Sequence, residues 1–308
     1  MRSAPLTPSA PAPVLDATTL GLYGAVVLVW GVSWIALKAH LGVVAPEVSA
    51  LWRFMIAAAI MVAWVAARGD RMRFSPRDHL RFALVGACMF SFNFVLFYYG
   101  GLHIPSGLLA VVFSLASVMN LLLGAALFGQ RIERRVALGA LIGTLGVALL
   151  FWPEIAGAGF DRAALGGLGL CVLGTLLFCC GNLVTGRLQR EGVPVQAINA
   201  WGMVYSVVGL AVFSGLRGQP FVVEWTPTYL GALLFLAVFA SVVAFACYGA
   251  LIGRIGPARG AYATVLFPIV ALTVSTLLEG YAWTLLAAAG AVCALIGNAL
   301  VLWRPAAR

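Results

Sequence analysis

Long apolar runs without a charged residue constrain this chain more than any other feature. Such runs cover residues 17–37, 82–130, 136–153, 163–186, 192–216, 225–253, 260–278 and 280–303. Most of them can cross a bilayer, which takes about 20 apolar residues in a helix. Hydrophobic residues fill 63% of the 308 positions and charged residues only 9%, whereas soluble domains have about 45–50% and about 25%. The sequence therefore predicts an all-α membrane protein.

The pattern of these runs predicts ten transmembrane helices. The run 82–130 is too long for one crossing and is interrupted by the glycine-rich segment 100–107, so it supplies two helices joined by a turn. A further helix, 46–67, carries Arg53 near its start, six residues after Glu47. Residues 1–16 are rich in Pro, Ala, Ser and Thr and predict a disordered tail. A cleaved signal peptide is the alternative, but no small-x-small site follows the first apolar run, which favours a retained helix.

Positive charges lie mainly on one side of the predicted topology. Fifteen of the 19 Lys and Arg residues fall in the tails and in alternate loops: Arg2, Arg68, Arg71, Arg73, Arg77, Arg81, Arg131, Arg134, Arg135, Arg187, Arg190, Arg254, Arg259, Arg304 and Arg308. The positive-inside rule then places both termini in the cytoplasm of a bacterial inner membrane protein. The net charge of +9 is explained by this orientation, so we expect no nucleic-acid partner.

The two halves of the chain align at an offset of 151 residues. The offset pairs Ala137-Leu138-Gly139-Ala140 with Ala288-Ala289-Gly290-Ala291, and Gly129, Gly146 and Trp152 with Gly280, Gly297 and Trp303. A fixed offset over this length indicates duplication, with repeats at 17–153 and 154–308. Five helices in each repeat is an odd number, so the repeats have opposite orientations. Inverted-topology repeats around a central cavity are typical of secondary transporters.

Two segments of the first half resemble a known family. They are Leu28-Val29-Trp30-Gly31-Val32-Ser33-Trp34-Ile35-Ala36-Leu37-Lys38 and Leu51-Trp52-Arg53-Phe54. Together with the two half-copies, they resemble the drug/metabolite transporter superfamily in its ten-helix EamA-type branch. The resemblance implies a two-fold basket of helices that exports amino acids, drugs or related metabolites. The aromatic-rich spans are most similar to bacterial aromatic amino-acid exporters.

The chain departs from the family at one motif. Many members carry a Gly-Glu pair after the fourth and the ninth transmembrane helix. At these places this chain has Gly129-Gln130 and Gly280-Tyr281. A role of that acid in other members is therefore not expected here.

Aromatic and polar residues far from the loops are the candidate substrate-binding residues. Aromatic faces bury an apolar side chain, while hydroxyls and amides hold the ammonium and carboxylate of a zwitterion. The predicted set is Trp30, Ser33, Trp34, Asn93, Tyr98, Tyr99, Asn120, Asn182, Trp201, Tyr205, Tyr248 and Tyr262. The alternatives are interfacial anchoring for the tryptophans and helix-to-helix hydrogen bonds for the polar groups.

Charged residues within the spans are few. We interpret Arg53, at the outer end of its helix, as a snorkelling anchor in preference to a substrate contact. Proton-driven carriers usually bury an Asp, Glu or His, and none is central here, since Glu279 lies at a helix end. This favours substrate flow down its own gradient or exchange.

Gly139-x-x-x-Gly143 and Gly290-x-x-x-Ala294 predict packing seams, at which two helices approach each other closely.

These features favour a secondary transporter that exports neutral amino acids, aromatic or other, by alternating access. The alternative is efflux of cationic lipophilic drugs, for which buried acids would be expected. No His-Glu-x-x-His, Gly-x-Ser-x-Gly or paired intramembrane Asp occurs in the sequence, so an enzyme is not expected. The expected partners are a small-molecule substrate and the lipid bilayer, without cofactor or metal, and the expected state is a monomer or homodimer.

Overall fold

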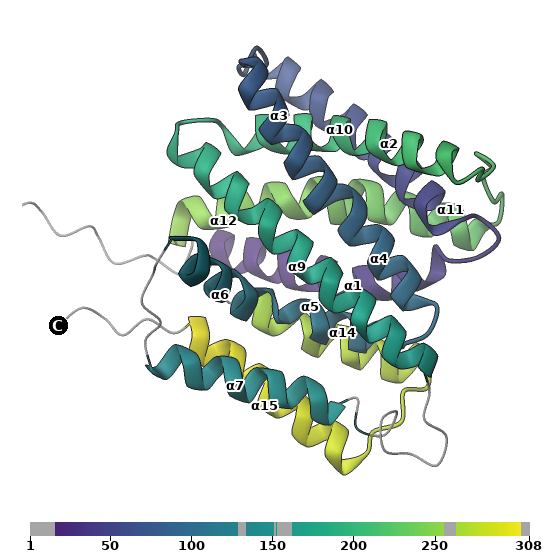
Figure 1. The fold of residues 1–308 in the computed structure, drawn as a ribbon, viewed down its shortest axis with the longest axis vertical. Coiled ribbons are helices and arrows are strands. Elements are labelled where there is room, and N and C mark those ends of the chain that lie inside the picture. Colours follow the sequence, from purple (N-terminus) through teal and green to yellow (C-terminus); the bar gives the residue numbers. More distant parts are fainter. Residues whose placement is uncertain (1–15, 129–133, 151, 153–161, 256–262, 303–308) are drawn as a thin grey trace, which may run out of the picture.

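The computed structural model describes residues 16–128, 134–150, 152, 162–255 and 263–302. These ranges form helices joined by loops and contain no strand (Figure 1). The first half contributes α1 (Ala17–Ala39), α2 (Pro46–Ala67), α3 (Pro76–Val85), η1 (Gly86–Ser91), α4 (Phe92–Gly101), α5 (Ser106–Ser114), α6 (Ala116–Phe128) and α7 (Arg134–Leu150). The second half contributes α9 (Arg162–Arg190), α10 (Val195–Leu216), α11 (Pro227–Leu234), η2 (Phe235–Val243), α12 (Ala244–Ile255), α14 (Ala263–Leu278) and α15 (Leu285–Leu302).

Seven of the described helices are long and apolar enough to cross a membrane. They are Ala17–Ala39, Pro46–Ala67, Pro76–Gly101, Ser106–Leu127, Arg162–Arg190, Val195–Leu216 and Pro227–Leu251, and two shorter apolar helices, Val265–Leu278 and Leu285–Leu300, follow. A transmembrane helix satisfies all of its backbone hydrogen bonds internally, which is why lipid accepts it. The predicted all-α membrane class is confirmed by these helices.

Two helices begin at proline behind a capping side chain. The Ser75 side chain accepts a hydrogen bond from the backbone N–H of Asp78, and the Asp78 side chain accepts one from the backbone N–H of Ser75. Pro76 occupies the first turn. At α11 the Thr226 side chain accepts a hydrogen bond from the backbone N–H of Tyr229, and Pro227 follows it in the first turn. A missing N–H costs nothing in the first turn of a helix, and the cap oxygen satisfies one of the free donors there.

Two π-helical segments interrupt the spans that follow these caps. In η1 the Ser91 hydroxyl donates to the Gly86 carbonyl at 2.9 Å, and in η2 the Ser241 hydroxyl donates to the Leu236 carbonyl at 2.8 Å. Both bonds reach back five residues, the spacing of a π-helix, and such segments often occur at functional sites. The two hydroxyls also contact other helices, Ser91 at Ser206 of α10 and Ser241 at Arg53 of α2.

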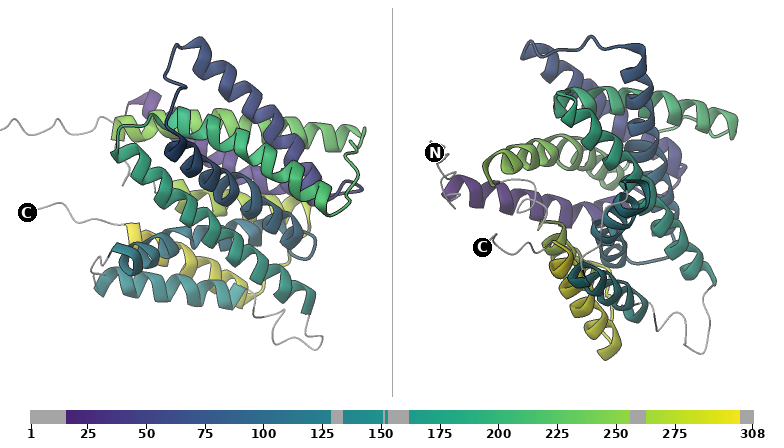
Figure 2. Two further views of the ribbon diagram at one scale, coloured as in Figure 1. Left: turned by 45° about the horizontal axis from the view of Figure 1, so that its top comes forward. Right: turned by 60° about the vertical axis from the view of Figure 1, so that its left-hand side comes forward.

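Helices α7 and α15 lie side by side along one edge of the bundle in all views (Figures 1 and 2). Glycines line their contact, and a Cβ built at Gly290 would lie 2.6 Å from the Gly146 carbonyl oxygen. The absence of side chains lets the two backbones approach closely, as in other membrane helix pairs. The predicted packing seams are therefore confirmed, and they face each other.

Candidate functional site

A cavity of about 310 Å³ is lined by helices from both halves of the chain. Its described lining is mostly aromatic and apolar, with a few polar groups: Trp30, Ser33, Trp34, Leu37, Arg53, Met89, Asn93, Phe94, Phe97, Phe113, Ala116, Ser117, Asn120, Phe178, Asn182, Ala240, Phe245, Tyr248 and Phe267. A mainly apolar wall with a small number of placed polar groups is the usual composition of a small-molecule site.

Helix α1 supplies one wall of this cavity. Trp30, Ser33, Trp34 and Leu37 recur at spacings of three and four, which place them on one helical face. The Trp30 indole donates to the Ala240 carbonyl at 3.3 Å, and its ring centroid lies 5.1 Å from that of Tyr248. Trp34 is buried, and its Nε1 has no partner among the described residues. Their place in the cavity wall does not fit interfacial anchoring.

Three asparagines bring amides to the cavity from different helices: Asn93 on α4, Asn120 on α6 and Asn182 on α9. Asn93 is only 1% exposed, yet neither its Oδ1 nor its Nδ2 has a hydrogen-bond partner in the described part of the chain. A buried amide without a partner carries a desolvation cost of about 1–3 kcal/mol. Asn93 therefore brings a buried amide with unused donor and acceptor capacity to the cavity wall.

Arg53 lines the same cavity and was not among the predicted site residues. It is 4% exposed, so the snorkelling interpretation was wrong. Its Nε donates to the Ser241 hydroxyl at 3.1 Å, and its guanidinium carbon lies 4.2 Å from the ring centroid of Phe94. The sequence signal that marked it was a positive charge within the predicted apolar helix 46–67.

Four of the predicted residues do not line the cavity. Tyr98 is hydrogen-bonded to Nδ1 of His40 at 2.8 Å, and Tyr99 donates to Glu47 at 2.8 Å. On α10, Trp201 donates to the Met72 carbonyl at 3.1 Å and Tyr205 is hydrogen-bonded to His79 at 3.1 Å. The polar atoms of all four residues are therefore bonded to protein groups. Tyr262, the last predicted residue, lies outside the described residues.

Polar contacts join several helices near the C-terminal end of α1 and the N-terminal end of α2. Glu47 is fully buried, accepts from Tyr99 and lies 3.4 Å from Arg217 Nη1. Lys38 Nζ lies 4.0 Å from Glu279, whose other carboxylate oxygen accepts from Ser106 and Ser275. The contacts of Glu47 connect α2, α4 and the residue that follows α10, and those of Glu279 connect α1, α5 and α14.

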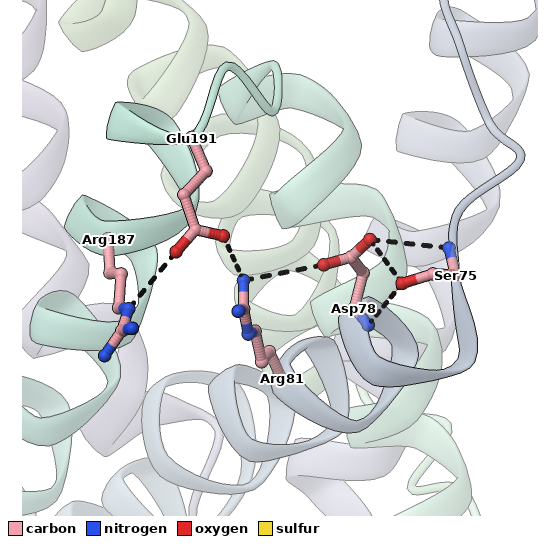
Figure 3. A network of polar contacts seen from close by, with 5 residues as sticks. All are labelled: Ser75, Asp78, Arg81, Arg187 and Glu191. Carbon is pink, nitrogen blue, oxygen red and sulfur yellow. Dashed lines mark hydrogen bonds and ion pairs between the residues drawn. The ribbon is translucent and has the colours of Figure 1, made fainter.

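A second network joins helices at the opposite end (Figure 3). Arg81 of α3 pairs with Asp78 on its own helix and with Glu191, which follows α9, while Arg187 contacts the other oxygen of Glu191 at 3.2 Å. The hydrogen bonds from Arg81 and then Arg187 hold the pKa of Glu191 below its ordinary value. This network connects a helix of the first half with one of the second.

No group of three or more His, Cys, Asp or Glu side chains that could hold a metal occurs among the described residues. The described cysteines are free thiols. The cavity can therefore offer aromatic faces, amides, hydroxyls and one guanidinium to a ligand, which suits reversible binding of a small organic molecule.

Membrane-length helices around such a cavity define a multi-pass transporter for a small molecule. The chain belongs to the EamA-like transporter family, whose sequence profile matches residues 19–152 and again residues 163–303. This confirms the resemblance noted in the sequence and the assignment as a transporter in place of an enzyme.

Curated relatives cover nearly the whole chain. A "Probable amino-acid metabolite efflux pump" of Salmonella typhimurium is 25% identical over 281 residues, which are 88% of this chain and 90% of the relative. A protein of the same description from Escherichia coli strain K12 is 26% identical over 284 residues, with 88% and 90% covered. A solved crystal structure matches 92% of this chain and 96% of its own with a TM-score of 0.67, and at 20% identity it shows a shared fold.

Proposed function

We propose that this protein is a secondary transporter that exports neutral amino acids, aromatic ones among them, across the bacterial inner membrane by alternating access. The observation that carries the proposal is the aromatic and amide-lined cavity between the two halves of the chain. Its aromatic rings suit an apolar side chain, and its amides suit the polar groups of an amino acid. The relatives described as amino-acid metabolite efflux pumps support the same substrate class.

The proposal includes ten spans arranged as two inverted five-helix repeats, 17–153 and 154–308. The seven long helices and three shorter ones together give the ten spans. The shorter helices are α7, α14 and α15, of 17, 16 and 18 residues. Two family matches in one chain support duplication. Paired contacts support it too: Trp52 donates to the Val222 carbonyl, and Trp201, 149 positions later, donates to the Met72 carbonyl.

The arginine-rich end of the bundle is assigned to the cytoplasm by the positive-inside rule, which places both termini there. The Glu47 end, closed by the contacts of Arg217 and Glu279, then faces the outside. Alternating access requires those contacts to break when the cavity opens outward. The halves of an inverted repeat exchange conformations in that step.

Efflux of cationic lipophilic drugs is the alternative, and the charge of the cavity argues against it. Its described lining includes the guanidinium of Arg53 and no Asp or Glu. A lone positive charge in a medium of low dielectric constant repels a second cation. The same lack of acids in the described lining favours a facilitator or an exchanger, since proton coupling usually uses a buried titratable group.

Reconstitution into liposomes tests the proposal. Uptake of labelled phenylalanine, tryptophan, threonine and a cationic dye would be measured with and without an imposed pH gradient. We expect saturable amino-acid uptake with counterflow, unaffected by the gradient. Uptake of the dye alone would replace the proposal with drug efflux, and uptake without saturation or counterflow would indicate a channel.

A further inference from the structure

Arg53 is a buried cation without an anionic partner in the described part of the chain. It is 4% exposed within α2, and no carboxylate among the described residues forms an ion pair with it. Other described arginines, such as Arg81 and Arg217, do pair with carboxylates. An unpaired charge inside a membrane protein is costly, and such residues usually mark a substrate or ion site.

The groups around the guanidinium orient it without neutralising it. Nε donates to the Ser241 hydroxyl, and the Tyr98 phenol interacts with the guanidinium as well. The rings of Phe54 and Phe94 lie against it, with their centroids 5.1 and 4.2 Å from the guanidinium carbon. These partners are all neutral. Arginine has five N–H donors in a planar fork that matches the two oxygens of a carboxylate.

Two further groups in the same cavity wall have unused hydrogen-bonding capacity. Both amide atoms of Asn93 and the Nε1–H of Trp34 have no partner among the described residues, and both side chains are more than nine-tenths buried. Asn93 immediately precedes Phe94, whose ring lies under the guanidinium. The cavity thus combines one unpaired cation with unpaired N–H donors, a combination that is complementary to an organic anion.

We propose that Arg53 forms a carboxylate subsite in the cavity, in which the guanidinium pairs with the carboxylate of the transported molecule and Asn93 and Trp34 donate hydrogen bonds to the bound molecule. This deepens the proposed function and rests on it. The substrate class is then a carboxylic acid with an apolar remainder, including zwitterionic amino acids, and the carboxylate is the required feature. The aromatic rings of Phe113, Phe178 and Tyr248 surround the remainder.

Competition on the wild-type protein tests this without any substitution. In proteoliposomes, counterflow of labelled phenylalanine would be competed by unlabelled phenylalanine, by 3-phenylpropionate, which lacks the ammonium, and by phenylalaninamide and phenethylamine, which lack the carboxylate. We expect 3-phenylpropionate to compete, and the two compounds without a carboxylate to be more than tenfold weaker than phenylalanine. Equal competition by phenylalaninamide would overturn the subsite while leaving amino-acid transport intact. Absence of phenylalanine counterflow would instead count against the proposed function.

A variant pair adds a second, independent readout. In Arg53→Gln we expect the KM for phenylalanine to rise more than tenfold and the preference over phenylalaninamide to disappear, whereas Arg53→Lys, which keeps the charge, should retain part of both. Monodispersity in detergent checks that each variant folds. Wild-type KM and wild-type discrimination in a folded Arg53→Gln protein would contradict the proposal. If that variant does not fold, the competition profile of the wild-type protein decides.

Discussion

Nε of Arg53 donates a hydrogen bond of 3.1 Å to Oγ of Ser241, which joins α2 to the π-helical segment η2 beside the cavity. Ser241 in turn donates to the Leu236 carbonyl five residues back. The π-helical turn and the orientation of the guanidinium are therefore linked through one hydroxyl. Because Arg53 is the only charged residue in the described cavity lining, this link fixes where the positive charge lies.

Replacement of Ser241 by Ala tests that link. The variant leaves Nε of Arg53 without its acceptor, and hydrogen bonds to charged groups contribute about 1.5–3 kcal/mol. We expect the KM for amino-acid transport to rise by about tenfold, since 1.4 kcal/mol corresponds to a factor of ten.

Ser91→Ala is the matched control. Ser91 makes the equivalent bond to the Gly86 carbonyl in η1, but its second contact is Ser206, away from the cavity lining. This variant should keep the wild-type KM. Equal kinetics for Ser241→Ala and Ser91→Ala would show that the hydroxyl of Ser241 does not position the guanidinium.

The seam between α7 and α15 predicts a large effect of one methyl group. A Cβ at Gly290 would lie 2.6 Å from the Gly146 carbonyl oxygen and 2.7 Å from the Leu150 nitrogen, so Gly290→Ala must push the helices apart. Overpacking of this kind costs about 1–3 kcal/mol, and we expect a lower melting temperature in detergent. Gly169→Ala, on α9 with no atom within 4 Å of its Cβ, should melt at or above the temperature of the wild type, because Ala favours a helix more than Gly does. Equal melting of both variants would contradict the seam.

The Glu191 network predicts a pH-dependent contribution to stability. Hydrogen bonds from Arg81 and Arg187 lower the pKa of Glu191 from about 4.5, so the folded state favours the charged carboxylate. The stabilisation is then complete above that pH and is lost as the pH falls through the lowered pKa. We expect Glu191→Gln to lower the melting temperature at pH 7 by roughly 1–2 °C, since the pair is exposed.

Melting curves between pH 7 and pH 3 would show this difference and its loss in acid. Asp70→Asn is the control, because among the described residues the ion pair of Asp70 is with Arg68, two positions before it, and does not join the two halves. A difference between wild type and Glu191→Gln that persists unchanged at pH 3 would rule out the ion pair as its cause.

The membrane class and part of the cavity could be predicted from the sequence because they depend on local patterns. Charge-free runs identify helices, and the three-and-four spacing of Trp30, Ser33 and Trp34 identifies a shared face. On α4 the same rule is insufficient, since Tyr98 lies four residues after Phe94 and yet does not line the cavity with Asn93, Phe94 and Phe97. Composition alone did not distinguish these faces.

The remaining differences between the predicted residues and the cavity lining concern long-range contacts. Trp201 and Tyr205 have the residue types of a binding site, but their polar atoms are used by Met72 and His79, far away in the sequence. Arg53 has the type of an anchor, but the packing of α2 against η2 buries it. Helical periodicity shows which residues share a face, but it does not show which other segment that face contacts.

Counterflow of labelled phenylalanine by Asn93→Ala in proteoliposomes tests the central claim, that the cavity is the transport site, most directly. Asn93 is buried, lines the cavity and lacks partners among the described residues. Its replacement should therefore weaken substrate binding and leave the stability of the fold unchanged. We predict a rate at least about tenfold below wild type, with normal expression, while Tyr205→Phe, outside the cavity lining, keeps the wild-type rate. A wild-type rate in Asn93→Ala would contradict the account.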